Sequence, residues 1–239
     1  MGYLSGHMNH RCQFLLFLFA CLSNIELRSQ PIESNSLKII TNVERVRESS
    51  LTNPSLEMVE LKSLVPEIRY ELAYAQKTNF THQRLYSKKL KTTYLRKDVA
   101  LALKLVAEEL SKNGLGILVW DAYRPYSVTQ KFWTLIHDER YVANPSKGSG
   151  HNRGIAIDMT IYDLASGSLL EMPTGFDDFS ENAHHGYKNL PANRIENREL
   201  LRSVMEKHGF VKFETEWWHY SWPSPSKYDI LDIPFSKLK

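Results

Sequence analysis

Hydrophobic and polar residues alternate with a period of two over residues 154–161, which predicts a β-strand. One face of this strand carries only large apolar side chains, those of Ile155, Ile157, Met159 and Ile161. The other face carries Asp158 at its middle, where an unpaired charge would be costly. We therefore expect the first face to pack on a core, and a cation or several hydrogen-bond donors to lie beside Asp158.

Apolar positions at helical spacing predict three helices. The first covers residues 96–112 and stops at Gly114, which tolerates a left-handed backbone. The second covers residues 126–137 and follows Pro125, a residue suited to the start of a helix. The third covers residues 197–208. Together they predict a fold that combines helices with short strands.

Four more short strands are expected, at residues 68–74, 117–120, 210–213 and 217–222, with Tyr74 at the end of the first. Residues 164–193 are rich in Gly, Pro, Asp, His and Asn, and so long an irregular segment is typical of a functional loop. The pair His184-His185 in this loop is expected to be solvated rather than to bind a metal ion.

Composition and charge narrow the classes of protein. A chain of 239 residues with 42% hydrophobic content can form one well-cored globular domain, and a two-lobed single domain is the alternative. The net charge is only +3, and no block of Lys and Arg is interleaved with aromatic residues. No nucleic-acid partner is therefore expected.

The amino-terminal segment predicts export. The apolar run 14–22 follows Arg11, is too short to span a bilayer and suits the centre of a secretory signal. Residues 18–21 resemble a bacterial lipobox ending at Cys21, so lipidation of Cys21 and plain cleavage stay open as alternatives. We expect residues 1–30 to be a signal peptide or lipoprotein signal, and the protein to be periplasmic or tethered to the membrane by lipid.

Both cysteines, Cys12 and Cys21, lie in that segment, so the mature domain is expected to contain no disulfide, thiol nucleophile or cysteine metal ligand. Residues 31–57 are polar and predict a spacer. The functional domain is accordingly placed at residues 58–239.

Two histidines complete a candidate metal site with Asp158. His151 precedes the strand in a Gly-rich loop, and His219 lies in the late aromatic run 216–220. Two imidazoles and one carboxylate form the ligand set of an open catalytic zinc site, with a water in the fourth position. For His219 alone, a buried histidine bonded to a backbone carbonyl is the simpler interpretation.

Two further residues carry candidate chemistry. Glu216 and His219 would point to opposite faces of an ideal strand, so Glu216 is expected at the bend before it. From there Glu216 could approach an attacking water as a general base without binding the metal. Arg124 emerges at the end of strand 117–120, where functional side chains gather, although by itself it would be read as a surface ion pair.

Taken together, these residues resemble the zinc D-alanyl-D-alanine dipeptidases, within the wider group of D,D-carboxypeptidase-like metallopeptidases. The matching motifs are Ser149-x-His151-x-x-Gly154-x-Ala156-x-Asp158, Glu216-Trp217-Trp218-His219 and Tyr123-Arg124-Pro125. Weaker matches extend the resemblance over about residues 60–235. The stretch between Arg124 and His151 is shorter than in the family's glycopeptide-resistance enzyme, so this pocket wall is expected to differ.

The resemblance implies a fold, an activity and residue roles. The fold is α+β, with a small antiparallel sheet carrying the metal site and helices packed on its other face. The activity is zinc-dependent hydrolysis of the D-alanyl-D-alanine dipeptide in cell-wall peptide turnover, with one Zn²⁺ per chain. The implied metal ligands are His151, Asp158 and His219.

The resemblance also assigns the remaining site residues. Glu216 would act as general base and acid, and Arg124 would stabilise the oxyanion. Tyr74, Ser149 and Asp177 match positions around the family's dipeptide pocket, with Asp177 as the partner of a substrate ammonium.

Three other functions stay open at this point. A D,D- or L,D-carboxypeptidase trimming peptidoglycan shares the ligand set and would not require a free amino group two residues from the scissile end. A non-haem iron oxygenase also uses two histidines and a carboxylate, but with one residue between the first two ligands rather than six, and on a jelly roll. A non-catalytic wall-binding module would not need Glu216 and Arg124. The oligomeric state is not predicted by any pattern in the chain.

Overall fold

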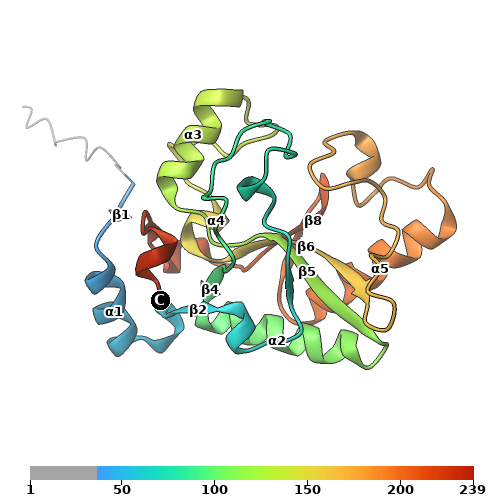
Figure 1. The fold of residues 1–239 in the computed structure, drawn as a ribbon, viewed down its shortest axis with the longest axis horizontal. Helices are drawn as coiled ribbons and strands as arrows, with labels where there is room; N and C mark the ends of the chain where they lie inside the picture. The colour runs from blue at the N-terminus through green and yellow to red at the C-terminus, as the bar shows by residue number, and fades with distance from the viewer. Residues whose placement is uncertain (1–36) are drawn as a thin grey trace, which may run out of the picture. The chain divides into compact units, whose positions relative to one another are not determined.

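A five-stranded sheet forms the centre of the computed structural model, which describes residues 37–239 (Figure 1). The strand order is β3 (Arg69–Tyr70), β5 (Leu115–Asp121), β6 (Ala156–Asp163), β8 (Glu216–Ser221) and β7 (Val211–Phe213). β3 pairs with β5 in parallel, and every other neighbouring pair in this sheet is antiparallel. The expected α+β class with a small, mainly antiparallel sheet is confirmed.

The central strand β6 is buried along almost its whole length. Asp158 lies opposite Asp121 of β5 on one side and opposite His219 of β8 on the other. Because residues paired across antiparallel strands project from the same face, the register gathers these three polar side chains on one face of the sheet.

Helices α2 (Lys97–Ser111) and α5 (Ala192–Lys207) cover the opposite face of the sheet. Their buried apolar side chains join one cluster with the face of β6 that was expected to be core: Val99, Leu103, Val106, Leu110, Leu201, Val204, Met205, Ile155, Ile157, Met159 and Ile161. Helix α5 begins earlier than residue 197, directly after Pro191. Its first turn is mostly exposed and polar, so the apolar pattern marks only its later part.

The remaining elements surround the metal-bearing face and the edges of the sheet. They are α3 (Tyr126–Ile136), the short α4 (Gly150–Arg153), the antiparallel pair β2 (Met58–Glu60) with β4 (Tyr94–Arg96), and the parallel pair β1 (Ile39–Ile40) with β9 (Ile230–Leu231). The strand predicted at residues 68–74 is shorter than expected. After Glu71 donates its N–H to Val119, the chain turns, so Tyr74 lies in a 3₁₀ turn, Ala73–Ala75.

The spacer predicted at residues 31–57 is not what the structure has over residues 37–57. This stretch contains β1 and helix α1 (Val43–Thr52), and the compact unit is Ser36–Lys239. Val46 is buried in a cluster with Ile40 and Ile233. It is the one buried residue of α1, so the polar composition belongs to an exposed helix rather than a spacer. The predicted signal at residues 1–30, with Cys21, lies outside the described residues. Within residues 37–239, no helix has the length and hydropathy to cross a membrane.

Candidate metal centre

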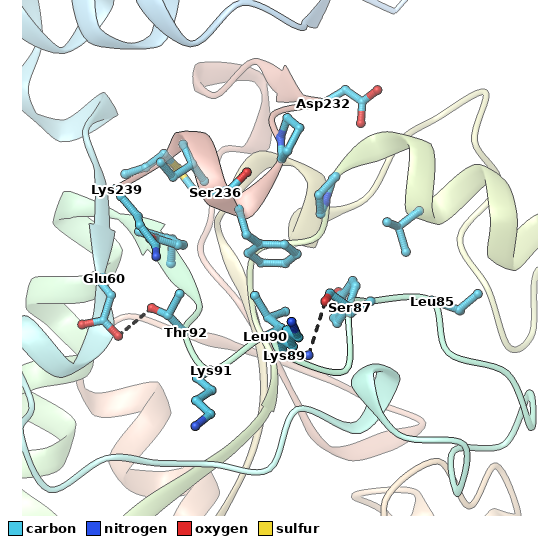
Figure 2. Close-up of a pocket in the computed structure, with 18 of the residues that line it drawn as sticks. Glu60, Leu85, Ser87, Lys89, Leu90, Lys91, Thr92, Asp232, Ser236 and Lys239 are labelled. Carbon is cyan, nitrogen blue, oxygen red and sulfur yellow. Dashed lines mark hydrogen bonds between the residues drawn. The ribbon is translucent and has the colours of Figure 1, made fainter.

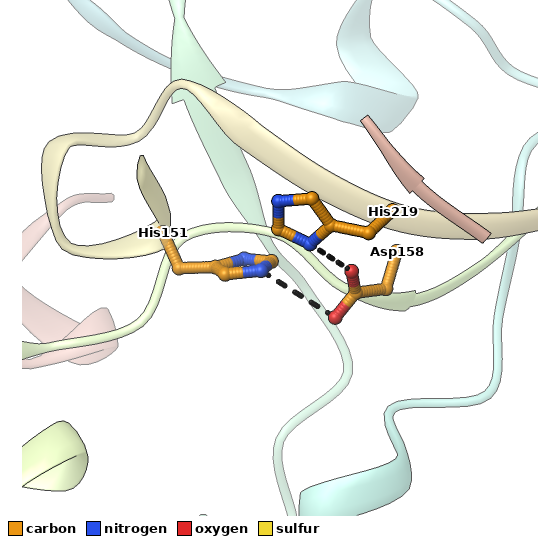
Figure 3. Close-up of side chains that lie close together, drawn as sticks. All are labelled: His151, Asp158 and His219. Carbon is orange, nitrogen blue, oxygen red and sulfur yellow. Dashed lines mark hydrogen bonds and ion pairs between the residues drawn. The ribbon is translucent and has the colours of Figure 1, made fainter. Parts of the chain in front are cut away.

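His151, Asp158 and His219 meet although they come from α4, β6 and β8 (Figure 3). One ligand atom from each lies within 4.8 Å of the others. Asp158 Oδ1 is 2.8 Å from His219 Nδ1, and Asp158 Oδ2 is 3.5 Å from His151 Nε2. The three side chains could hold a metal ion, and the expectation that Asp158 needs cationic or donating neighbours is confirmed.

A capped single turn of helix positions His151. Ser149 Oγ accepts a hydrogen bond from the N–H of Asn152 at 3.2 Å, and Asn152 Oδ1 accepts one from the N–H of Ser149 at 3.1 Å. This reciprocal cap satisfies backbone donors at the helix start. A Cβ at Gly150 would lie 2.8 Å from the Cβ of Ala156, so glycine permits α4 to pack closely on β6.

The tautomer of His151 suits a metal ligand. Its Nδ1 lies 2.7 Å from the carbonyl oxygen of Ala122, which can only accept a hydrogen bond, so Nδ1 carries the proton. The lone pair is then on Nε2, the atom that faces Asp158. A hydrogen bond of this kind orients the imidazole of a metal-binding histidine.

The electrostatics of the group favour an ionised carboxylate. Burial by itself would raise the pKa of Asp158, but the imidazoles of His151 and His219 outweigh it and hold that pKa below its usual range. Burial alone would lower the pKa of His219, and the Asp158 carboxylate raises it instead. A buried carboxylate that attracts positive charge in this way, with imidazole nitrogens beside it, is a donor set that zinc accepts.

Glu216 approaches the three ligands without joining them. Its Oε2 lies 3.9 Å from His219 Nδ1. Glu216 was expected at a bend, yet it is the first residue of β8, where the pairing with β7 changes register and Glu216 faces Phe213. This irregularity brings side chains three positions apart to one cavity. Burial raises the pKa of Glu216 while His219 opposes the rise, and a raised pKa suits a carboxylate that must exchange a proton near neutral pH.

Arg124 is buried, with 7% of its surface exposed, so it is no surface ion pair. Its Nε and Nη2 donate to Asp121 Oδ2 at 2.9 and 2.7 Å. Burial would lower the pKa of Arg124, but the Asp121 carboxylate raises it above its ordinary value. The backbone N–H of Arg124 donates to the carbonyl oxygen of His151 at 3.1 Å, which ties the arginine to the helix that carries the ligand.

Sequence reasoning missed Asp121. Besides Arg124, its carboxylate accepts the hydroxyl proton of Tyr86 at 2.7 Å and lies 3.8 Å from His151 Nδ1. A carboxylate at the end of a buried strand, three positions before an arginine, is the signal that could have indicated it.

All eight site residues predicted from the sequence line one cavity of about 250 Å³: Tyr74, Arg124, Ser149, His151, Asp158, Asp177, Glu216 and His219. The Tyr74 hydroxyl donates to Asp177 Oδ1 at 3.1 Å, and Asp177 Oδ2 has no hydrogen-bond partner within the described part of the chain. Burial, with the Asp158 charge, raises the pKa of Asp177 well above its usual value. A carboxylate in this state would gain from a cation entering the cavity.

The histidine pair does not contribute to this cavity. His185 is 4% exposed and packs near Tyr220, with ring centroids 6.1 Å apart, so the expectation that it is solvated is wrong. The loop segment that carries it is held against the sheet, because the N–H of His185 donates to the carbonyl oxygen of Glu214. Burial lowers the pKa of His185 to about 4.

A larger cavity of about 950 Å³ lies elsewhere and is lined mainly by residues 85–94 and 232–239 (Figure 2). It contains none of the eight predicted residues. Tyr86 in its wall donates to Asp121, which is its link to the metal side of the sheet. Volume alone would therefore select the wrong cavity, whereas the donor set selects the smaller one.

Comparison with known proteins gives a consistent family. Residues 54–237 match the family model described as D-ala-D-ala dipeptidase. The D-alanyl-D-alanine dipeptidase of Escherichia coli K12 is 35% identical over 180 residues, which cover 75% of this chain and 92% of that protein. The D-alanyl-D-alanine dipeptidase of Enterococcus faecalis V583 is 32% identical over 193 residues, which cover 73% and 92%.

Similarity to solved structures is more distant. The LdcB LD-carboxypeptidase is 19% identical with a TM-score of 0.40, over 72% of this chain and 70% of that one. A vancomycin-resistance D,D-pentapeptidase in complex with Zn(II) is 17% identical with a TM-score of 0.37, over 56% and 75%. The matched range of the family model, 54–237, contains all eight residues of the cavity.

Proposed function

Since this chain belongs to the D-alanyl-D-alanine dipeptidase family of metallopeptidases, we propose that it hydrolyses the free dipeptide D-Ala-D-Ala with one zinc ion per chain. The observation that carries the proposal is the convergence of the ligands His151, Asp158 and His219 with Glu216 and Arg124 on one cavity. Its volume of about 250 Å³ lies below the roughly 300–1,000 Å³ usual for drug-sized ligands, which suits a very small substrate.

The metal would be held by His151, Asp158 and His219, and when bound it supplies a Lewis acid and lowers the pKa of a coordinated water. The Glu216 carboxylate takes a proton from the attacking water and delivers it to the nitrogen of the leaving D-alanine. Arg124 donates hydrogen bonds to the carbonyl oxygen as negative charge develops there. Asp121 keeps that guanidinium in place through two hydrogen bonds to one carboxylate oxygen.

The free amino group of the substrate is proposed to bind Asp177. Its Oδ2 lacks a partner among the described residues, and Tyr74 orients the carboxylate through Oδ1. A substrate ammonium would supply both the hydrogen-bond donor and the positive charge that this buried group lacks. Ser149 contributes by capping the helix that holds His151, and its hydroxyl lines the cavity.

Replacing Asp177 by asparagine is expected to raise the KM for D-Ala-D-Ala about tenfold or more, because a charged hydrogen bond is worth roughly 1.5–3 kcal/mol. The KM for an N-acetylated dipeptide should change little, since that substrate carries no ammonium. The matched control is Asp178→Asn at the exposed neighbouring residue. Steady-state kinetics with both substrates decide the point, and an equal rise for both would make Asp177 a structural residue.

A carboxypeptidase acting on longer wall peptides is the second candidate. A cavity of about 310 Å³ adjoins the metal cavity and shares Phe80 and Asp177 with it, so it offers room beyond the proposed ammonium site. Incubating the zinc-loaded protein with D-Ala-D-Ala, L-Ala-L-Ala and an amino-blocked tripeptide, followed by product analysis, separates the two. Release of D-alanine from the free D,D-dipeptide supports the dipeptidase, and cleavage of the blocked tripeptide alone supports the carboxypeptidase.

Export and a role in cell-wall peptide turnover are also proposed. The support is the apolar run 14–22 after Arg11, followed by a polar stretch. Fractionation of cells that express the full chain should place the protein outside the cytosol, and Cys21→Ser should release it from membranes if Cys21 is lipidated. Intact, uncleaved protein in the cytosol would contradict export.

A further inference from the structure

The loop between α3 and α4 forms one wall of the metal cavity, and Arg140 is one of its lining residues. We propose that Arg140 binds the terminal carboxylate of the substrate and so makes the site specific for a peptide with a free carboxyl end. This inference rests on the proposed function and identifies the residue at the opposite end of the substrate from Asp177.

The loop is anchored on both sides of Arg140. Val142 is buried in a cluster with Tyr74 and Phe132. The ring of Tyr141 packs on Phe179, with centroids 4.9 Å apart. Arg140 therefore projects from a segment that is fixed to the core on one side and to the opposite cavity wall on the other.

The contacts of Arg140 itself are local and exposed. Its Nε lies 3.1 Å from each carboxylate oxygen of Asp138, and its Nη2 lies 2.6 Å from Oδ2. The side chain is 76% exposed, and exposed ion pairs of this kind contribute little to stability. Within residues 37–239, Nη1 of Arg140 makes no hydrogen bond, so the guanidinium still offers donors to a second carboxylate.

The charges that line the cavity leave Arg140 as the cation for this task. A free dipeptide brings one ammonium and one carboxylate, and Asp177 is assigned to the ammonium. Two arginines line the cavity, and Arg124 is held by Asp121 beside the metal ligands, where the attacked carbonyl must lie. The hydroxyl of Ser149, which also lines the cavity, carries no charge and already caps α4.

A planar guanidinium is well suited to this role, because it can bind a carboxylate through two parallel hydrogen bonds. Substrate selection would then come from two ends. Blocking the amino group removes the interaction with Asp177, and blocking the carboxyl group removes the interaction with Arg140. A free dipeptide is the substrate that satisfies both residues.

The test compares D-Ala-D-Ala with its carboxyl-terminal amide in the zinc-loaded wild type and in Arg140→Gln. The variant should raise KM for the free acid about tenfold, since a charged hydrogen bond is lost, with kcat little changed. KM for the amide should stay the same, and Arg140→Lys should restore part of the preference for the acid. Lys147→Gln is the matched control, because Lys147 is a 70%-exposed cation of the same loop that pairs with Glu139.

The outcomes for Arg140 and for the proposed function are separate. If the wild type hydrolyses the dipeptide but Arg140→Gln leaves KM unchanged, or raises it equally for acid and amide, Arg140 does not bind the carboxylate. If the wild type cleaves a longer peptide and no dipeptide, the proposed function fails. The same comparison of acid and amide forms of that longer peptide then decides the role of Arg140.

Discussion

Replacing Glu216 by alanine is expected to lower kcat by about 10²–10⁴, the usual contribution of a positioned general acid–base group. Glu216 is the carboxylate nearest to the three ligands that is not one of them, with Oε2 3.9 Å from His219 Nδ1. Its side chain is 16% exposed, so it faces the cavity while staying largely shielded from solvent. The zinc content and the unfolding temperature should stay close to those of the wild type.

Two comparison variants make this test specific. Glu216→Gln preserves the shape and removes the base, so it should lose nearly as much kcat as the alanine variant. Glu214→Gln alters an acid that is 73% exposed and pairs with Lys212, so it should leave kcat unchanged. Loss of zinc together with activity in Glu216→Ala would make Glu216 a ligand, and His151, Asp158 and His219 would not be the complete set.

Replacing Arg124 by alanine is expected to lower kcat by about 10²–10³, as found when a donor to a developing oxyanion is removed. KM should change less, because the interaction strengthens as the carbonyl oxygen gains charge. The zinc content should be retained, since Arg124 is not part of the ligand group.

The Arg124 variant also has a cost in stability, which must be measured separately. Its loss leaves the carboxylate of Asp121 buried without its main partner, and breaking a buried ion pair costs roughly 3–5 kcal/mol. Arg124→Lys keeps a positive charge for Asp121 and should recover most of that stability but only part of kcat. A folded, zinc-loaded Arg124→Ala protein with kcat close to the wild type would show that Arg124 does not act on the carbonyl.

The metal ligands could be predicted from the sequence because their signals are local. Strand periodicity placed Asp158 on the polar face of a central strand, and short motifs marked His151 and His219. The strand register that brings Asp158 opposite His219 pairs residues 61 positions apart, and periodicity alone does not specify such a pairing. The resemblance to a family supplied that missing step.

The contacts that arrange the site could not be predicted for the same reason. Tyr86 and Asp121 are 35 positions apart, and their hydrogen bond depends on the path of an irregular segment. The role proposed for Arg140 depends on Tyr141 packing against Phe179 from a different loop. Such contacts are set by tertiary packing, which leaves no periodic trace in the chain.

Secondary structure was predictable where one face of an element is apolar. Helix α2 matches its predicted range to within one residue at each end, because its buried positions recur through its whole length. Helix α1 was missed since Val46 is its one buried residue, and polar helices resemble spacers in composition. His185 was expected in solvent because of its loop context, yet packing near Tyr220 buries it.

The most direct test of the zinc assignment is elemental analysis of purified protein, with circular dichroism to verify folding. The wild type, Glu216→Ala and the control His184→Ala, which lies outside the cavity, should each contain one zinc ion per chain. The double variant His151→Ala/His219→Ala should fold and contain none, because it loses two of the three ligands. Stoichiometric zinc in that double variant would contradict the assignment.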